Sequence, residues 1–202
     1  DWSSDVCSSD LNGVKSKDVL ELVSNISDLG VPVLVMTYWN PIEKYGVSKF
    51  ASELKNAHGA GLITPDLTVE EASEWNQVAD NLELAKVFVL APSSSDQRVK
   101  LISDNASGFI YAASLMGVTG VRNFLTNDAS KLVSRIKKES SLPVAVGLGV
   151  SNGEQAKTVA SYADGVIVGS AFIKIIQTSK DFDSAKAGVK KLAQELRAGV
   201  ER

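Results

Sequence analysis

The sequence predicts an α/β protein built as an incomplete (β/α)8 barrel, with six of its eight βα units present and the first two missing. Six short apolar runs alternate with helical patterns, about one unit every 32 residues, which is typical of successive βαβ units around a parallel sheet. Glycine-bearing loops follow the last strands, where barrels commonly bind phosphate. A doubly wound open sheet is the competing architecture, but no GxGxxG motif follows the first strand.

The elements follow one another in a regular order from residue 14. Helical patterns are expected near residues 19–29, 47–57, 69–80, 95–104, 127–139, 152–161 and 182–199. The apolar runs that predict strands are VLVMTY (33–38), GAGLITPD (59–66), AKVFVLAP (85–92), GFIYAAS (108–114), PVAVGLG (143–149) and DGVIVGS (164–170). Gly30 is expected to end the first helix, because glycine readily adopts the left-handed conformation of a helix terminus.

The composition excludes several classes of function. The chain has 202 residues, of which 44% are hydrophobic, enough for one globular domain with a sizeable core. A formal net charge of −3 argues against a nucleic-acid groove, and no apolar run approaches the ~20 residues of a membrane span. One cysteine and one histidine exclude a disulfide framework and disfavour a zinc site. We therefore expect a cytoplasmic protein with no metal and with neither nucleic acid nor membrane as a partner.

The first eleven residues, DWSSDVCSSDL, differ from the rest of the chain. They contain four serines, three aspartates and the only cysteine, without helical or strand periodicity and without the regions of a signal peptide. A capping loop is one interpretation, but the string resembles translated sequencing-adaptor sequence. We therefore interpret residues 1–11 as a disordered, non-native leader and residues 12–202 as a partial barrel domain whose natural chain was longer at its N-terminus.

The segment DGVIVGSAFIKII carries the first candidate binding site. Val166, Ile167 and Val168 indicate a strand buried on both faces, and Ser170 is expected to be the N-cap of a short helix. Gly169 would let a ligand oxygen approach the backbone, while unpaired amides and the helix dipole would attract an anion. A plain tight turn is the competing interpretation.

Two further loops strengthen the prediction of a phosphate site. GLGVS places Gly147 and Gly149 at the end of the preceding strand, where bare backbone can face a ligand. MGVTGVRN places Thr119 and Gly120 after the strand GFIYAAS. Three such loops on one face of a barrel could surround one phosphate from different sides.

Several motifs together resemble one enzyme family. SLMGVTGVRN, VAVGLGVSNGEQA, DGVIVGSAFIKII, VMTYWNPIEKYG and TPDLTVEEA are similar to the α subunit of tryptophan synthase, and the resemblance runs from about residue 12 to residue 200. It implies cleavage of indole-3-glycerol phosphate to indole and glyceraldehyde 3-phosphate in tryptophan biosynthesis. It also implies an α2β2 heterotetramer in which the β subunit holds pyridoxal phosphate, so that this chain needs no cofactor.

The resemblance implies roles for individual residues. The residues that match the family's phosphate contacts are Thr119, Gly120, Gly149, Gly169 and Ser170. Those that match its indole pocket are Tyr38, Tyr111 and Leu148. Those that match its interface with the β subunit are Asn40, Pro41 and Asp66. Leu148 stands where the family often has phenylalanine. SLMG replaces the commoner Ser-Arg-Thr-Gly pattern, which removes one cation near the flexible loop.

The family's catalytic carboxylates have no counterpart in this chain. Protonation of the indole ring needs an acid that reaches the reacting atom. The family carries its Glu on the second barrel strand and its Asp in the next loop, and both would lie upstream of residue 12. Asp66 matches the partner interface, and Glu43, Glu70 and Glu71 are expected to be exposed. We therefore predict no catalytic residue here and an inactive fragment. The alternatives are another phosphate-binding barrel, such as an isomerase or epimerase, and a non-catalytic remnant that docks on a β subunit.

Overall fold

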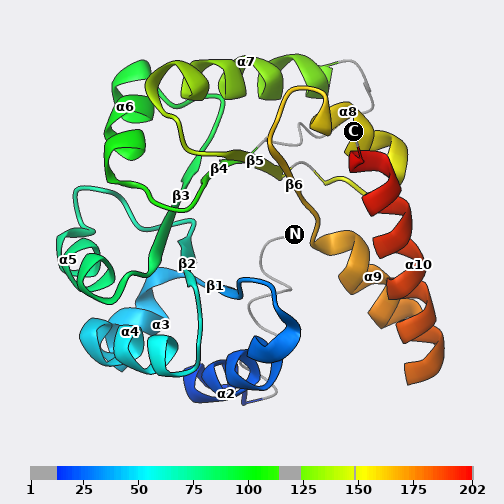
Figure 1. Cartoon of the computed structure of the whole chain (residues 1–202), viewed down its shortest axis with the longest axis horizontal. Coiled ribbons are helices and arrows are strands. Elements are labelled where there is room, and N and C mark those ends of the chain that lie inside the picture. Colours follow the sequence, from blue (N-terminus) through cyan, green and yellow to red (C-terminus); the bar gives the residue numbers. More distant parts are fainter. Residues whose placement is uncertain (1–12, 114–123, 148, 202) are drawn as a thin grey trace. The chain divides into compact units, whose positions relative to one another are not determined.

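A computed structural model describes residues 13–113, 124–147 and 149–201 (Figure 1). This part of the chain forms two compact units. The first unit contains the residues up to Phe88 together with Asn105–Ser107, and the second contains Val89–Asp104 and the residues from Gly108 onward. The predicted leader lies outside the described residues, so its assignment stays a prediction. No described helix has the length and apolar character that crossing a membrane requires.

The first unit is built on parallel strand pairs. Its elements are α2 (Ser16–Ile26), the 3-10 turn η1 (Ser27–Leu29), β1 (Leu34–Met36), α3 (Trp39–Tyr45), α4 (Val47–Asn56), β2 (Gly61–Thr64), α5 (Ser73–Leu82) and the first part of β3 (Ala85–Leu90). Strand β2 lies between β1 and β3, with Leu34 opposite Gly61 and Gly61 opposite Ala85. Helices α4 and α5 pack together, and Phe50, Leu54 and Trp75 are almost fully buried. Burial of large apolar side chains is the main stabilising contribution to this core.

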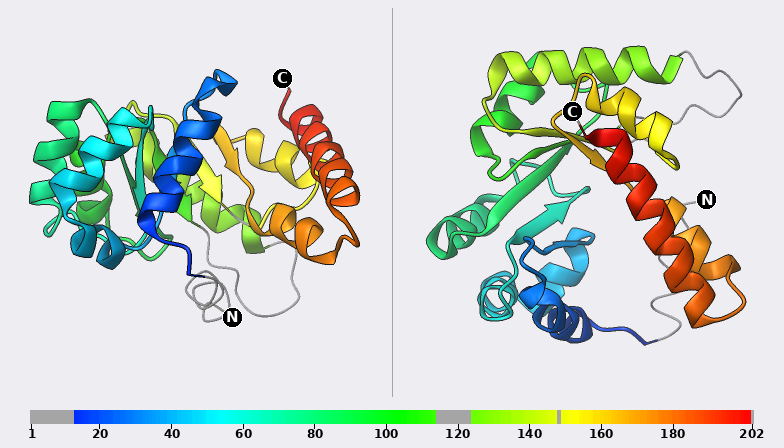
Figure 2. Two further views of the ribbon diagram at one scale, coloured as in Figure 1. Left: turned by 90° about the horizontal axis from the view of Figure 1, so that it is seen from below. Right: turned by 45° about the vertical axis from the view of Figure 1, so that its right-hand side comes forward.

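The second unit continues the same alternation. It contains the end of β3, α6 (Asp96–Asn105), β4 (Ile110–Ala113), α7 (Phe124–Glu139), β5 (Val144–Gly147), α8 (Gly153–Ala160), β6 (Gly165–Ile167), α9 (Ser170–Thr178) and α10 (Phe182–Val200). Strands β3 to β6 pair in parallel and in sequence order. The prediction of six parallel strands is therefore confirmed for the described part of the chain. Figure 2 shows α10 alongside both α8 and α9.

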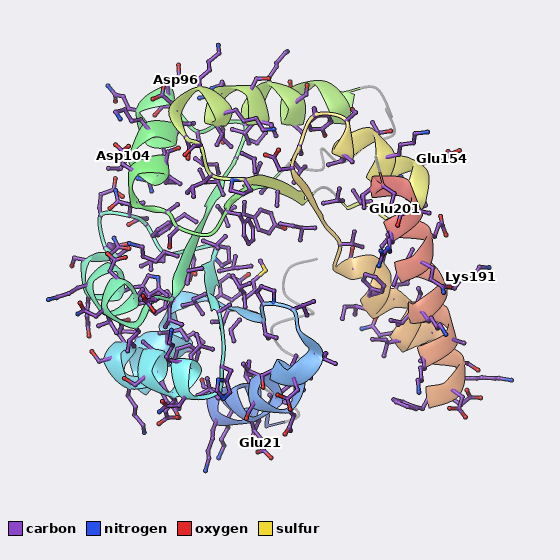
Figure 3. The ribbon with its side chains drawn as sticks, in the orientation of Figure 1. Glu21, Asp96, Asp104, Glu154, Lys191 and Glu201 are labelled. Carbon is purple, nitrogen blue, oxygen red and sulfur yellow. The ribbon has the colours of Figure 1, made fainter. Side chains whose placement is uncertain are left out.

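Charged side chains hold the outer helices of the second unit in place. Arg135 of α7 donates to Asp96 at 2.8 Å and also to the carbonyl of Ser94. Asp96 lies at the start of α6 (Figure 3). Lys137 pairs with Asp164 at 2.9 Å, and the second oxygen of this carboxylate accepts the Val144 amide at 3.0 Å. These bonds fix α7 against α6 and the ends of β5 and β6.

Strand β6 corrects one expectation. Val166, Ile167 and Val168 were expected to be buried on both faces, but each of them is only half-buried. Strand β6 is paired with β5 and is the last strand in the order, so one of its edges has no strand neighbour among the described residues. A cavity of about 510 Å³ also lies beside it, lined by Val166, Val168, Leu196 and Val200 among others.

Apolar side chains are also exposed near both end strands. In the first unit, Met36 of β1 is 55% exposed, and Leu22 of α2 is exposed as well. In the second unit, Ile173 and Ile176 of α9 are both exposed. Exposed apolar side chains next to an unpaired strand edge favour association with other chains.

Helix α3 and the start of α9 differ from the predicted pattern. The residues of α3 were not predicted as a helix, because Pro41 and the preceding strand obscure the periodicity. Pro41 fits in the first turn, where backbone amides have no intrahelical partner. Ser170 was expected to be an N-cap, but Gly169 takes that position and Ser170 is the first residue of α9.

Candidate functional site

The second unit brings two of the predicted phosphate loops to one edge of its sheet. Gly149 follows β5 and Gly169 follows β6, and these strands are parallel neighbours with Gly147 opposite Ile167. The carboxyl ends of parallel neighbours lie at the same edge, which is where α/β proteins bind their ligands. Gly149 has a φ of 65°, a left-handed conformation that an L side chain rarely adopts. The chain therefore needs glycine at this turn.

The start of α9 offers backbone donors for which no described residue supplies an acceptor. Its first helical hydrogen bonds are donated by Phe172 and Ile173 to the carbonyl of Gly169. The amides of Ser170 and Ala171 precede these bonds, and the N-cap residue, Gly169, has no side chain that could cap the helix. Gly169 and Ser170 are both exposed. Unpaired amides at a helix N-terminus form a site that suits a phosphate oxygen.

Tyr111 lies close to this edge and contacts Gly147 directly. Tyr111 of β4 is opposite Ala145, so Gly147, two residues further along β5, is on the same face of the sheet. An ideal Cβ at Gly147 would lie 2.1 Å from the Tyr111 hydroxyl oxygen. Burial raises the pKa of the Tyr111 hydroxyl above its ordinary value of 10.0, so the ring remains a neutral phenol. A planar apolar ligand could pack against such a ring.

This contact changes the role expected for Gly147. The sequence suggested that Gly147 exposes bare backbone to a ligand, but the structure places the Tyr111 ring over it. A large aromatic residue on one strand and a glycine on the next are the signal that could have predicted the contact. Recognising this signal requires the strand register, which the sequence alone does not provide.

The predicted partner-interface residues lie together in the first unit. Both oxygens of the Asp66 carboxylate accept the Trp39 amide, at 2.9 and 3.0 Å, so Asp66 caps α3 from the loop after β2. Asn40 and Pro41 lie in the first turn of α3, and both are exposed, as is Asp66. Tyr38, the N-cap residue of α3, is half-buried.

Loss of the Asp66 cap should destabilise the protein measurably. We expect Asp66→Ala to lower the free energy of unfolding by about 0.5–2 kcal/mol, the usual cost of removing a helix cap. Asp66→Asn should cost less, because the amide oxygen can still accept the Trp39 hydrogen bond. Urea unfolding measures both, with exposed Glu43→Ala on the same helix as the control. Equal stabilities of the Asp66→Ala and Glu43→Ala proteins would contradict the capping role.

The remaining predicted site residues fall into two groups. Thr119, Gly120 and Leu148 lie outside the described residues, so their roles stay predictions. Glu43, Glu70 and Glu71 are exposed, and so is His58, which has a φ of 60° after α4. Within residues 13–113, 124–147 and 149–201, no group of three His, Cys, Asp or Glu side chains is arranged to hold a metal ion.

Comparison with known proteins gives one consistent result. A family model described as tryptophan synthase alpha chain matches residues 8–201. The tryptophan synthase alpha chain of Thermobifida fusca is 50% identical over 191 residues, which cover 93% of this chain and 71% of that protein. The alpha chain of Streptomyces avermitilis is 52% identical over 189 residues, which cover 93% of this chain and 68% of that protein.

The solved structures that resemble this chain belong to the same family as these relatives. A structure of Mycobacterium tuberculosis tryptophan synthase has a TM-score of 0.85 and 44% sequence identity, covering 94% of this chain and 70% of that one. The tryptophan synthase A-subunit of Pyrococcus furiosus has a TM-score of 0.81 and 35% identity, covering 93% of this chain and 75% of that one. The matched regions therefore share both sequence and fold.

Proposed function

The chain belongs to the tryptophan synthase alpha chain family, and we propose that it binds indole-3-glycerol phosphate through the phosphate end of that family's site. Its fold is the family's (β/α)8 barrel, represented by six βα units. In this proposal Gly149, Gly169 and Ser170 contact the phosphate, together with Thr119 and Gly120 by family resemblance. The family's reaction is the cleavage of a carbon–carbon bond, which makes its members lyases.

One observation carries this proposal. The left-handed turn at Gly149 and the N-terminus of α9 lie at the carboxyl ends of neighbouring parallel strands. Backbone amides from both segments can hydrogen-bond to one phosphate, and the dipole of α9 favours its negative charge. A helix that begins soon after a strand, with glycine as its N-cap residue, is well suited to this task.

The organic part of the substrate requires apolar contacts. Tyr111 supplies a neutral aromatic face in the second unit, and burial supports its protonated state. Family resemblance adds Tyr38 and Leu148 to the proposed indole contacts. These residues bind and orient the substrate but supply no acid strong enough to protonate the indole ring.

The proposed partner is a tryptophan synthase β subunit. Asn40, Pro41 and Asp66 form one exposed group around the start of α3, which supports their assignment to the interface. An α2β2 assembly in the cytoplasm, with pyridoxal phosphate on the β subunit, completes the proposal. A non-catalytic protein that only docks on a β subunit remains the second candidate function.

Phosphate binding by a Gly169 variant tests the proposal. Among the described residues, a Cβ at Gly169 would meet no atom within 4 Å, and its φ of −126° lies outside the left-handed region that favours glycine, so we expect Gly169→Ala to fold. The added methyl group should nevertheless obstruct the oxygen that approaches the backbone. We expect Gly169→Ala to weaken binding of inorganic phosphate or glycerol 3-phosphate at least roughly tenfold, about the worth of one hydrogen bond to a charged group.

The controls separate ligand approach from folding. Gln177→Ala changes an exposed residue at the other end of α9 and should leave phosphate affinity unchanged. Melting temperatures of both variants should match that of the unaltered chain. Isothermal titration or NMR titration gives the dissociation constants. Unaltered phosphate affinity in folded Gly169→Ala protein would refute the proposed site.

A further inference from the structure

Helix α10 touches the start of α8 at the backbone level. An ideal Cβ at Gly199 would lie 2.3 Å from the carbonyl oxygen of Gly153, and one at Gly153 would lie 2.7 Å from the carbonyl oxygen of Glu195. Both positions therefore require glycine. Figures 1 and 2 show α8 and α10 running close together. The amide of Gly153, the first residue of α8, donates to the Glu195 carboxylate at 3.0 Å.

The other hydrogen bonds at this helix start are local. Asn152 accepts the Gln155 amide at 2.9 Å, and the Gln155 side chain accepts the Ser151 amide at 2.8 Å. These three residues belong to one short segment, so their bonds shape the turn but do not fix it to another element. The Glu195 bond joins residues that are 42 positions apart, and it ties the start of α8 to α10.

The loop that carries Gly149 ends at the hydrogen bond between Gly153 and Glu195. It leaves β5 at Gly147, which is held under the Tyr111 ring, and it enters α8 at Gly153. Between them Gly149 is exposed in its left-handed conformation, while Val150 is only 4% exposed. The direction of the Gly149 amide therefore depends on both ends of a short loop. A shift of α8 by a fraction of an ångström would be transmitted to it, because the packed Val150 side chain has little room to adjust.

We propose that Glu195 is a positioning residue for phosphate binding, which acts through Gly153 on the Gly149 loop and does not touch the ligand. This inference rests on the proposed phosphate site. The direction in which phosphate affinity changes when the Glu195 carboxylate is removed distinguishes a positioning role from a purely electrostatic one. Removing a carboxylate near an anion site should strengthen phosphate binding if charge alone matters, because like charges repel. Positioning requires the opposite result, a loss of affinity.

Four variants of the full chain test the inference, with inorganic phosphate as the probe. Glu195→Ala removes the hydrogen bond and should raise the phosphate dissociation constant roughly two- to tenfold, the range expected for one hydrogen bond. Glu195→Asp keeps the charge but withdraws the carboxylate by one methylene group, and it should weaken binding in the same direction. Glu195→Gln removes the charge but keeps an acceptor oxygen for Gly153, so it should bind phosphate as tightly as the unaltered chain or more tightly.

Glu201→Ala is the matched control. It removes the same charge from the end of the same helix, where Glu201 bonds to Arg197 at 3.0 Å and not to α8, and it should not weaken binding. Figure 3 shows Glu201 at the end of α10 and Lys191 on its outer side. The exchange rate of the Gly153 amide, measured by NMR, should rise in Glu195→Ala and Glu195→Asp and stay unchanged in Glu195→Gln and Glu201→Ala.

The outcomes separate the inference from the proposed function. If the unaltered chain binds phosphate and Glu195→Ala binds it equally well or better, the positioning role is wrong while the proposed site stands. If Glu195→Ala does not fold, the comparison of Glu195→Asp with Glu195→Gln decides by the same criterion. A folded, unaltered chain that binds no phosphate contradicts the proposed function and the inference with it.

Discussion

Gly147→Ala is expected to destabilise the second unit and to displace the Tyr111 ring. The new Cβ would lie 2.1 Å from the Tyr111 hydroxyl oxygen and 2.6 Å from the adjacent ring carbon, far inside van der Waals contact. The new Cβ and the Tyr111 ring cannot both keep these positions, so either Tyr111 or β5 must move. Overpacking of this kind costs about 1–3 kcal/mol of folding free energy. Urea unfolding measures the loss, and the near-ultraviolet circular dichroism spectrum reports the displaced ring.

A double-mutant cycle identifies the cause of that loss. Tyr111→Leu removes the outer ring atoms and the hydroxyl, so Gly147→Ala should cost less in this background than in the unaltered chain. Gly165→Ala on the next strand is the control, since its Cβ would approach only Ala145 among the described residues, at 3.2 Å from its Cβ and 3.6 Å from its Cα. Its cost should be smaller and independent of Tyr111. Strict additivity of Gly147→Ala and Tyr111→Leu would show that the ring contact is not responsible.

Most of the fold follows from patterns that are local in sequence. Alternating apolar runs and helical periodicity predict the six parallel strands, and Gly30 ends the first helical segment in a left-handed conformation as expected. The errors occur where a distant residue decides the structure. Helix α3 begins where it does because Asp66, 27 residues away, accepts the Trp39 amide. The prediction that β6 is buried on both faces was wrong, because the burial of a strand depends on the elements packed around it and not on its own composition.

The features of the candidate site also divide into those that the sequence predicts and those that depend on distant residues. Gly149 and Gly169 could be placed at one edge because parallel topology brings the carboxyl ends of neighbouring strands together. The contact of Tyr111 with Gly147 depends on strand register, which short apolar runs specify poorly. The bond from Gly153 to Glu195 depends on how two helices cross. No sequence pattern within either helix predicts this crossing, since Glu195 is otherwise an ordinary exposed residue of an amphipathic helix.

The 202-residue chain is expected to release no indole from indole-3-glycerol phosphate above the uncatalysed background. Loss of a general acid alone typically costs about 10²–10⁴-fold in rate, and two carboxylates are required by the family's reaction. Among the described residues, Glu43, Glu70 and Glu71 are exposed, and Asp66 is engaged by the Trp39 amide. We assign none of these carboxylates to the protonation of the indole ring.

The assay must exclude an activation defect and an unfolded sample. Indole release is therefore measured with and without a tryptophan synthase β subunit, with the complete alpha chain of Thermobifida fusca as the active control. Phosphate titration of the same sample shows whether the binding half of the site is intact. Phosphate binding without indole release is the expected result, because Gly149, Gly169 and Ser170 provide backbone donors but no acid. Indole release that approaches the rate of the control would mean that a carboxylate of this chain reaches the ring, and alanine substitution of Glu43, Asp66, Glu70 and Glu71 in turn would then identify it.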